Sequence, residues 1–271
     1  MKAFLVWIQT QSWFSLSLYL SIIFAILYGL ITGFFSLMEH WAARNPAFKS
    51  RKIQNNDNKT AGVWHELFLS ALNLCIIGMI GATIFKLSLN GHTGIYVNVD
   101  RYGWWYLPVS FGLAYLFQDF WFYWSHRLLH TSDFLMQKVH YIHHYSLRPR
   151  PTTALSFHPL EGLIIYIAFL WIAILIPMHW LLFFLFTIFV LAHDIWAHNG
   201  YEWLPKAWLQ KGLFVRIFST TTQHDLHHQP QGFRYNYGPY LLFGDWITGT
   251  LYPNYFDYLK KHFASIAKER S

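Results

Sequence analysis

The sequence predicts an all-α protein that crosses a membrane several times. Hydrophobic residues make up 54% of its 271 positions and aromatic residues 21%, whereas charged residues make up only 12%. An average soluble domain carries about 25% charged residues. Several uncharged stretches also reach the length of about 20 residues that a helix needs to cross a bilayer. This composition excludes a disordered chain and disfavours a soluble globular one.

The charge and cysteine content exclude two further classes of protein. The 20 basic and 13 acidic residues give a net charge of +7, but the basic residues are spread along an apolar chain. This pattern favours basic loops beside a membrane over a nucleic-acid surface. The single cysteine, Cys75, lies in an apolar run and excludes both a disulfide scaffold and a cysteine-rich zinc site.

Three predicted membrane spans occupy the first half of the chain. The first covers about 16–38. It forms the second part of an uncharged stretch that begins at Ala3, and this stretch is too long for the core of a signal peptide. The second covers about 63–89. The third covers about 104–124 and contains one acid, Asp119.

A fourth apolar segment predicts a helical hairpin. Residues 162–193 carry no charge, and Pro177 lies near their middle. A single helix of this length would measure about 48 Å, which is too long for one crossing of a hydrocarbon layer of about 30 Å. Two shorter helices that turn near Pro177 fit better, and they return the chain to the side from which it came.

The loop between the first two spans indicates the orientation. It carries Arg44, Lys49, Arg51, Lys52 and Lys59 against the single acid Asp57. The positive-inside rule places this loop in the cytoplasm, of either a bacterial inner membrane or the endoplasmic reticulum. The histidine clusters described next are then expected to face the cytoplasm.

These segments predict a single membrane-embedded domain over residues 1–271. Its expected parts are three transmembrane spans within 15–124, a first histidine-rich region at 125–160, a membrane hairpin at 161–197 and a second histidine-rich cytoplasmic region at 198–271.

Histidine is unusually frequent, with 16 residues. Residues three or four apart on a helix differ by about 60° or 40° around its axis, so such spacings gather imidazoles on one face. Imidazole suits iron, zinc, copper and nickel. The informative groups are His126 and His130; His140, His143 and His144; His198; and His224, His227 and His228. Two copies of His-x2-His-His predict a metal site, whereas the isolated His40, His65, His92, His179 and His262 are interpreted as structural.

Other residues are expected around the ligands. His193 lies five residues before His198, about 140° away on a helix, so His198 is the expected ligand and His193 an outer-sphere candidate. Two divalent ions held by neutral imidazoles need nearby carboxylates to offset charge and orient the rings. Asp119, Glu161, Asp194 and Asp225 are placed for this role, and ordinary helix capping is the alternative for each.

The histidine groups and their surroundings resemble the fatty acid hydroxylase/sterol desaturase superfamily, and most closely its C-5 sterol desaturase branch. The similar stretch runs from about 115 to 253. It carries FWFYWSHRLLH, HYIHH, TTALSFHPLEG, HNGYEW and, after HDLHH, the run YNYGPYLLFGDWITGTLY. Sterol desaturases tend to have His-Asp-Gly where this chain has His198, Asn199 and Gly200, so the resemblance leaves the lipid open.

The resemblance implies an integral-membrane oxidoreductase with two iron ions, for which zinc is expected to substitute in preparations. Such an enzyme uses O2 and external electrons to hydroxylate or desaturate a sterol-like or fatty-acyl lipid. The electrons are expected from a separate cytochrome b5-like or ferredoxin-like protein. The implied metal ligands are His126, His130, His140, His143, His144, His198, His224, His227 and His228, with His158 as an outer or weaker ligand.

Three other hypotheses remain open. A zinc-dependent, non-redox lipid hydrolase would act without O2, although zinc hydrolases typically use three protein ligands and one water. The protease motif His-Glu-x2-His is absent, because Leu69 stands where His65 and Glu66 would need a second histidine. A metal transporter would place ligands along its spans. A haem protein would need two axial ligands rather than paired triplets.

Overall fold

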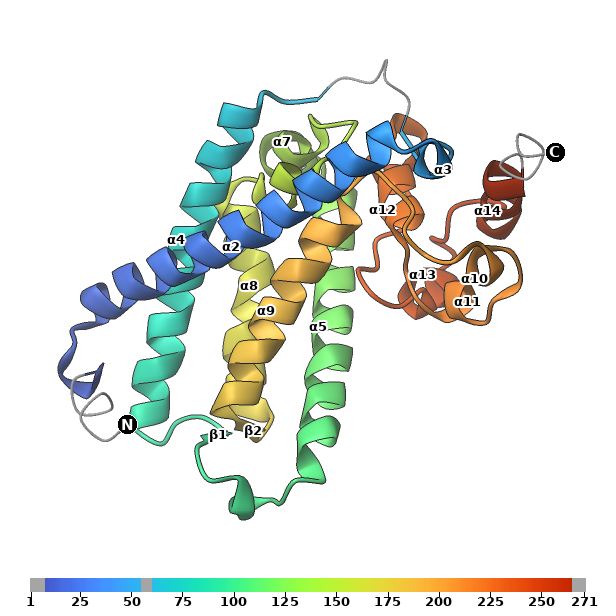
Figure 1. The fold of residues 1–271 in the computed structure, drawn as a ribbon. Helices are drawn as coiled ribbons and strands as arrows, with labels where there is room; N and C mark the ends of the chain where they lie inside the picture. Colours follow the sequence, from blue (N-terminus) through green and yellow to red (C-terminus); the bar gives the residue numbers. More distant parts are fainter. Residues whose placement is uncertain (1–7, 55–59, 265–271) are drawn as a thin grey trace.

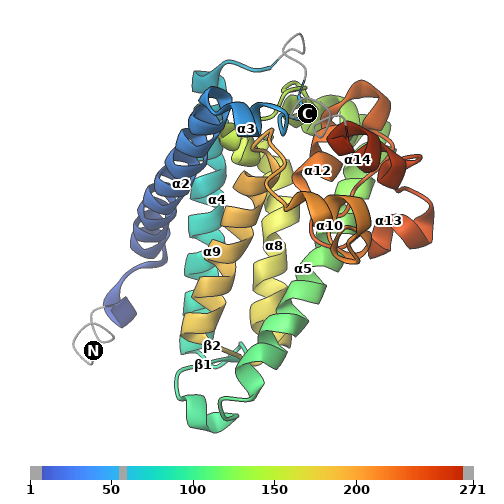
Figure 2. The ribbon, with the colours of Figure 1, turned by 45° about the vertical axis from the view of Figure 1, so that its right-hand side comes forward.

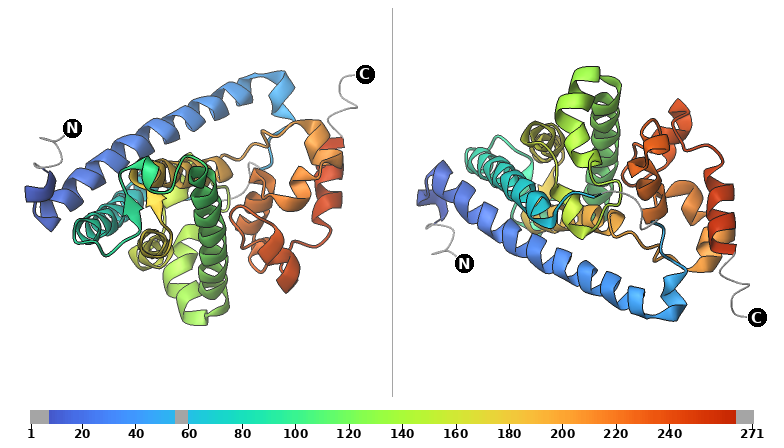
Figure 3. Two further views of the ribbon diagram at one scale, coloured as in Figure 1. Left: turned by 90° about the horizontal axis from the view of Figure 1, so that it is seen from below. Right: turned by 90° about the horizontal axis from the view of Figure 1, so that it is seen from above.

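Five long helices form the body of the molecule in a computed structural model that describes residues 8–54 and 60–264 (Figure 1). They are α2 (Trp13–Arg44), α4 (Val63–Leu89), α5 (Tyr106–Thr131), α8 (Pro159–Leu175) and α9 (Trp180–Ala197). Figure 3 shows α2 and α5 on opposite sides of the bundle, with α4, α8 and α9 between them. The predicted all-α membrane fold is confirmed.

The surface of the bundle is that of a membrane protein. Within the described residues, α2, α4 and α9 are long and apolar enough to cross a bilayer. The apolar helix α8 has 17 residues and is slightly shorter than these. On α2, Phe14 and Leu37 are more than 70% exposed, as expected for side chains that face lipid. α5 is also long, but it is less apolar because one face buries Asp119 and His126.

The hairpin turns where Pro177 predicts it. Pro177 has no backbone N–H and disfavours a helical residue before it, so α8 ends at Leu175. After the turn, β2 (Met178–His179) pairs in parallel with β1 (Ile95–Tyr96), which follows α4. This two-residue ribbon ties the hairpin to the connection between α4 and α5.

The other end of the bundle carries the short elements. They are α3 (Pro46–Lys49), α6 (Asp133–Leu135), the π-helical turn η2 (Met136–His140), α7 (Tyr141–His144) and the 3-10 turn η3 (Pro151–Leu155); the 3-10 turn η1 (Val99–Arg101) lies at the hairpin end. Arg44 and Arg51 of the basic loop lie at the end with α3, while Asp57 and Lys59 fall outside the described residues. The hairpin therefore returns the chain to the end where the first histidine box lies.

A cap of short helices follows α9 and packs beside α5 (Figure 2). It contains α10 (Lys206–Lys211), α11 (Phe214–Ile217), α12 (Thr221–His228), η4 (Pro230–Gly232), α13 (Phe243–Thr248) and α14 (Tyr255–Ala264). Leu259 and Phe263 of α14 belong to the cap's own hydrophobic core.

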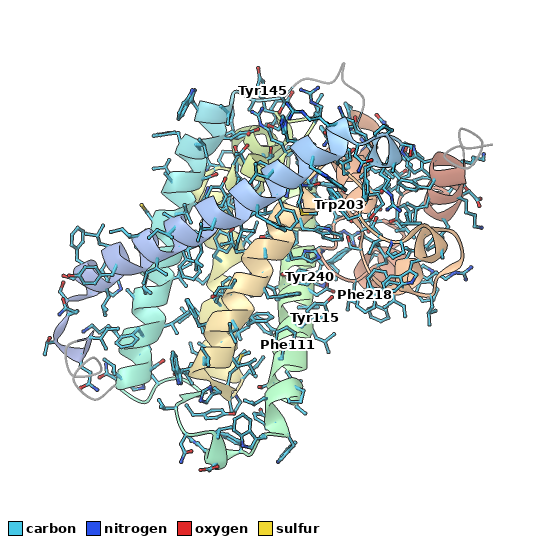
Figure 4. All side chains as sticks on the ribbon, viewed as in Figure 1. Phe111, Tyr115, Tyr145, Trp203, Phe218 and Tyr240 are labelled. Atoms are coloured by element: carbon cyan, nitrogen blue, oxygen red, sulfur yellow. The ribbon has the colours of Figure 1, made fainter. Side chains whose placement is uncertain are left out.

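Asp119 and an aromatic stack join the cap to the bundle. The Asp119 carboxylate accepts hydrogen bonds from the backbone N–H groups of Tyr240 and Leu241, at 3.1 and 2.9 Å. The Tyr240 ring stacks on Tyr115 of α5 with 4.9 Å between centroids. Figure 4 shows Phe111, Tyr115 and Tyr240 following one another along α5. These contacts hold the segment before α13 against the membrane helices.

Candidate metal centre

All nine histidines predicted as ligands meet at the capped end of the bundle, in two groups. The five-histidine group contains His126, His130, His140, His144 and His227; the four-histidine group contains His143, His198, His224 and His228. Within each group, the nearest nitrogens of all members lie within 4.8 Å of one another. Eight of the nine side chains belong to buried residues, and His130 is half-buried.

Histidines that lie four residues apart on one helical segment share a group. His126 and His130, His140 and His144, and His224 and His228 are each four residues apart, and each pair shares a group. The middle histidines, His143 and His227, join the opposite group from the pair that flanks them. Each His-x2-His-His box therefore contributes to both groups, where the sequence predicted a single shared face.

Backbone carbonyls fix the orientation of five of the rings. The Nδ1 atoms of these rings lie 2.6–3.3 Å from carbonyl oxygens: His126 from Tyr237, His143 from Ser156, His198 from Asp194, His227 from Tyr235 and His228 from Ser146. A carbonyl oxygen only accepts hydrogen bonds, so each Nδ1 must carry the proton. The neutral ring then presents its Nε2 lone pair to the group.

Glu161 orients a sixth ring. His140 Nδ1 donates to Glu161 Oε1 at 2.8 Å, and both side chains are almost fully buried. A carboxylate on the outer nitrogen fixes the tautomer and raises the basicity of the inner one. Glu161 is thus the one predicted acid whose carboxylate contacts a candidate ligand in the described residues.

The inner nitrogens of each group face one another at short distances. In the five-histidine group the Nε2 atoms of His130, His140 and His144 are 2.9–3.1 Å apart. In the four-histidine group His198 Nε2 lies 2.9 Å from His224 Nε2, and His228 Nε2 is buried without a partner among the described residues. Where both rings carry their proton on Nδ1, as in His126 and His140 at 3.2 Å, the facing Nε2 lone pairs repel unless a cation lies between them.

The donor set fits a divalent transition metal at each group. Burial and the neighbouring imidazoles hold the pKa of His143, His144 and His228 well below the usual 6.5, so these rings are neutral ligands at pH 7. Metal–imidazole bonds of about 2.1 Å at right angles separate adjacent nitrogens by about 3.0 Å. The observed spacings of 2.9–3.4 Å match that value.

The remaining acids act through other groups. Asp225 accepts a hydrogen bond from Gln54 Nε2 at 2.7 Å, and Asp119 accepts from the backbone as described above. Asp194 contacts His198 through its backbone carbonyl rather than its carboxylate. Their predicted contact with the ligand rings is therefore not found, because backbone carbonyls occupy most of the outer nitrogens.

His158 and His193, the two other histidines considered near the metal, lie outside both groups. His158 is the N-cap of α8, where its Nδ1 accepts from the Leu160 backbone N–H at 3.0 Å, so it is placed as a capping residue. His193 packs edge-on against Tyr240, with 4.6 Å between ring centroids. His193 also lines a cavity of about 30 Å³ beside the candidate metal centre.

Protein walls largely enclose this cavity. His140 of the larger group and His143, His198 and His224 of the smaller one line it. Phe157, Ile165 and Tyr166 provide much of its apolar wall, and Asp194 adds a carboxylate. The cavity therefore joins the two histidine groups to an apolar surface.

Glu66 supports the segment behind the second histidine box, a role that the spacing of residues in the sequence did not reveal. It is fully buried at the start of α4 and accepts hydrogen bonds from Ser146 Oγ and Arg150 Nε, each at 2.8 Å. The Ser146 carbonyl in turn accepts from His228. Glu66 thereby ties α4 to the segment behind the second histidine box. An acid inside a predicted span was the available signal, because such residues are costly unless they are paired.

Comparison with known proteins gives a consistent set of relatives. The family model for fatty acid hydroxylase matches residues 111–250, which is 140 of the 271 residues. A Delta(7)-sterol 5(6)-desaturase of Gibberella zeae is 31% identical over 68% of this chain and 54% of its own length. No solved structure matches the chain.

Two relatives from plants carry other names. A very-long-chain aldehyde decarbonylase of Oryza sativa subsp. indica is 36% identical over 53% of this chain and 55% of its own length. Sphinganine C4-monooxygenase 1 of Arabidopsis thaliana is 32% identical over 54% of this chain and 55% of its own length. The chain spans just over half the length of each of these three relatives.

Proposed function

Because this chain belongs to the fatty acid hydroxylase family, we propose that it is an integral-membrane di-iron enzyme that oxidises a lipid. It would use O2 and external electrons to hydroxylate a C–H bond or to desaturate the lipid. One observation carries the proposal: nine imidazoles, eight of them in buried residues, converge in two groups beside an apolar cavity at the end of a membrane bundle.

Unactivated lipid C–H bonds resist acid–base and nucleophilic attack, so the reaction needs a redox metal. Two iron ions held by the five- and four-histidine groups would supply electrons and a strong oxidant derived from O2. The chain's own residues do the rest. Backbone carbonyls and Glu161 hold six of the nine imidazoles in their ligating tautomer, and Phe157 and Ile165 give the cavity an apolar wall.

The relatives support a lipid substrate without selecting one. Their names refer to sterols, sphinganine and long-chain aldehydes, and this chain matches each over only part of its length. We infer a sterol-like or fatty-acyl lipid that reaches the cavity from the bilayer. A zinc hydrolase has no observation in its favour, since nine imidazoles exceed the three ligands that such sites typically use.

We propose that the metal end faces the cytoplasm and receives electrons from a separate protein. Arg44 and Arg51 lie at that end, as the positive-inside rule requires of a cytoplasmic face. Labelling of cysteines introduced at this end and at the hairpin end, from each side of the membrane, tests the orientation. Labelling of the metal end only from outside would refute it.

The first test is Mössbauer spectroscopy of protein expressed on 57Fe, with total metal measured on the same sample. We expect about two irons per chain in a nitrogen-rich environment, and lipid products that carry label from 18O2 if the reaction is hydroxylation. If zinc alone is found, anaerobic reloading with iron follows. Protein that still binds no iron pair, or that acts on lipid without O2, would contradict the proposal.

A further inference from the structure

The two histidine groups are unequal, and one unpaired carboxylate lies beside the smaller. Asp194 precedes His198 by four residues on α9, so the two side chains leave the helix about 40° apart. Both residues line the cavity together with His143 and His224 of the four-histidine group. The geometry therefore places a carboxylate beside the group that has one imidazole fewer.

Asp194 differs from the other acids near the centre. Asp119, Asp225 and Glu161 each use at least one carboxylate oxygen to accept a hydrogen bond. The Asp194 carboxylate accepts none from the described residues, and only its backbone carbonyl is engaged. A carboxylate without a partner in an apolar site is costly, so a cation or a donor is expected next to it.

We propose that the Asp194 carboxylate is the fifth donor of the four-histidine group. This inference rests on the proposed function, because it presumes that metal binds there. The carboxylate lies outside the 4.8 Å cluster formed by the four nitrogens, so its side chain must rotate when metal binds. The two metals then differ in kind: one has five nitrogen donors, and the other has four nitrogens and an anionic oxygen that offsets part of its charge.

Three variants at position 194 test this assignment through metal content and 57Fe Mössbauer spectra. Wild-type protein should show two iron signals of equal area. Asp194→Asn and Asp194→Leu should lower the affinity of one iron at least tenfold and leave the other signal unchanged. Asp194→His, which restores a donor, should recover two irons. The control is Asp119→Asn, a buried carboxyl that bonds only backbone, and it should keep both signals.

The outcomes separate this inference from the proposed function. If Asp194→Asn and Asp194→Leu keep two irons with wild-type spectra, Asp194 is not a ligand and the di-iron proposal stands. Failure of Asp194→His to recover the iron that Asp194→Asn loses would also refute a donor role. A wild-type protein that binds no metal pair would overturn both proposals.

An apolar surface on the cap supports a second, independent inference. On α13, the exposed residues Phe243, Trp246 and Ile247 follow helical spacing and form one face. The opposite face packs on α5, where Gly244 lies against the Tyr123 ring and Thr248 bonds the Tyr123 hydroxyl. We call the exposed residues Trp208, Leu213, Ile217, Phe243, Trp246 and Ile247 the cap surface.

The cap surface continues the lipid-facing side of α5. The Leu242 N–H donates to the Ile217 carbonyl at 2.9 Å, which joins the end of α11 to the start of α13. On α5 next to Tyr123, Phe120 is 61% and Trp124 47% exposed. Figures 1 and 2 show α10, α11 and α13 beside the upper part of α5, which continues well below them.

We infer that the cap surface lies in the interfacial layer of the bilayer. Soluble surfaces rarely expose contiguous apolar patches of this kind, and tryptophan favours the membrane interface. Arg127 lies over the Trp124 ring at 5.5 Å, where its charge can reach the headgroups while its stem stays on apolar surface. The cap then rests on the membrane beside α5 instead of projecting into water.

Depth-dependent quenching tests this placement in phosphatidylcholine vesicles. Cys75→Ser removes the exposed native thiol, and Ile247→Cys then carries an NBD fluorophore. Phosphatidylcholine with a 5-doxyl chain should quench this probe severalfold more than a matched probe at Lys260→Cys on α14. Equal, weak quenching at both positions would refute the inference. Crosslinking between copies through position 247 would do so as well, because a second chain would then cover the surface.

Discussion

The five-histidine and four-histidine groups use the same residue type but depend on different parts of the fold. The larger group draws on α5, on the turn from η2 into α7, and on α12. The smaller group replaces α5 with His198, which caps α9 at the end of the membrane hairpin. In the larger group, one ring donates its outer N–H to a carboxylate. In the smaller group, three rings have partners for their outer nitrogens, and all three partners are backbone carbonyl oxygens.

This difference shows how two metal sites can arise from repeated boxes. Within each box the outer pair lies on one helical face and the middle histidine points to the other group. Each box thereby contributes to both groups, and the hairpin supplies His198 to the smaller one. The smaller group has only four imidazoles, so we expect it to be the more vulnerable to the loss of one.

The largest effect is expected from alanine substitution of the two middle histidines. His143→Ala leaves three imidazoles in the smaller group, whereas His227→Ala leaves four in the larger one. We expect His143→Ala to release one of two metals and to lower lipid oxidation by at least about 100-fold, because orienting contacts alone are worth about 10–100-fold. His227→Ala should retain more metal. Metal per chain after dialysis against a chelator checks this, and equal losses would contradict the comparison.

A smaller effect is expected from Glu161, which orients only the larger group. Glu161→Leu removes the acceptor of His140 Nδ1 and should weaken metal binding there by about 10–100-fold. Glu161→Gln keeps an acceptor and should lose less. No described contact joins Glu161 to the smaller group, so the metal in that group should keep its affinity. Equal weakening of both metals would show that the two groups are not independent. Competition with a graded series of chelators measures both affinities.

A further prediction concerns the effect of acid on the stability of the fold. In the metal-free protein, burial keeps the pKa of His143 and His228 well below the 6.5 of an exposed histidine, so the unfolded chain binds more protons below that pH. Stability is therefore present above about pH 6.5 and falls as pH decreases, by up to about 1.4 kcal/mol per pH unit for each ring. Denaturation of metal-free protein across pH 5–8 tests this, and a flat profile would contradict it.

Much of the fold and most of the candidate ligands were predictable from local patterns. Apolar runs located α2, α4 and the hairpin, because bilayer thickness sets helix length. Pro177 located the turn through its missing N–H and the restraint on the residue before it. The His-x2-His-His boxes identified the histidines, because three- and four-residue spacing fixes angles around a single helix axis.

Only the tertiary structure decided how those histidines divide and what holds them. Spacing within one helix says nothing about where a second helix lies, so the sorting into five and four awaited the packing of α5, α7, α9 and α12. The carbonyls of Ser146, Ser156 and Tyr237 carry no sequence signal, since every residue has one. Asp194 and Glu66 look alike in sequence, as acids in apolar runs. The structure separates them. The Glu66 carboxylate accepts hydrogen bonds from its neighbours, whereas the Asp194 carboxylate faces the cavity beside the metal centre.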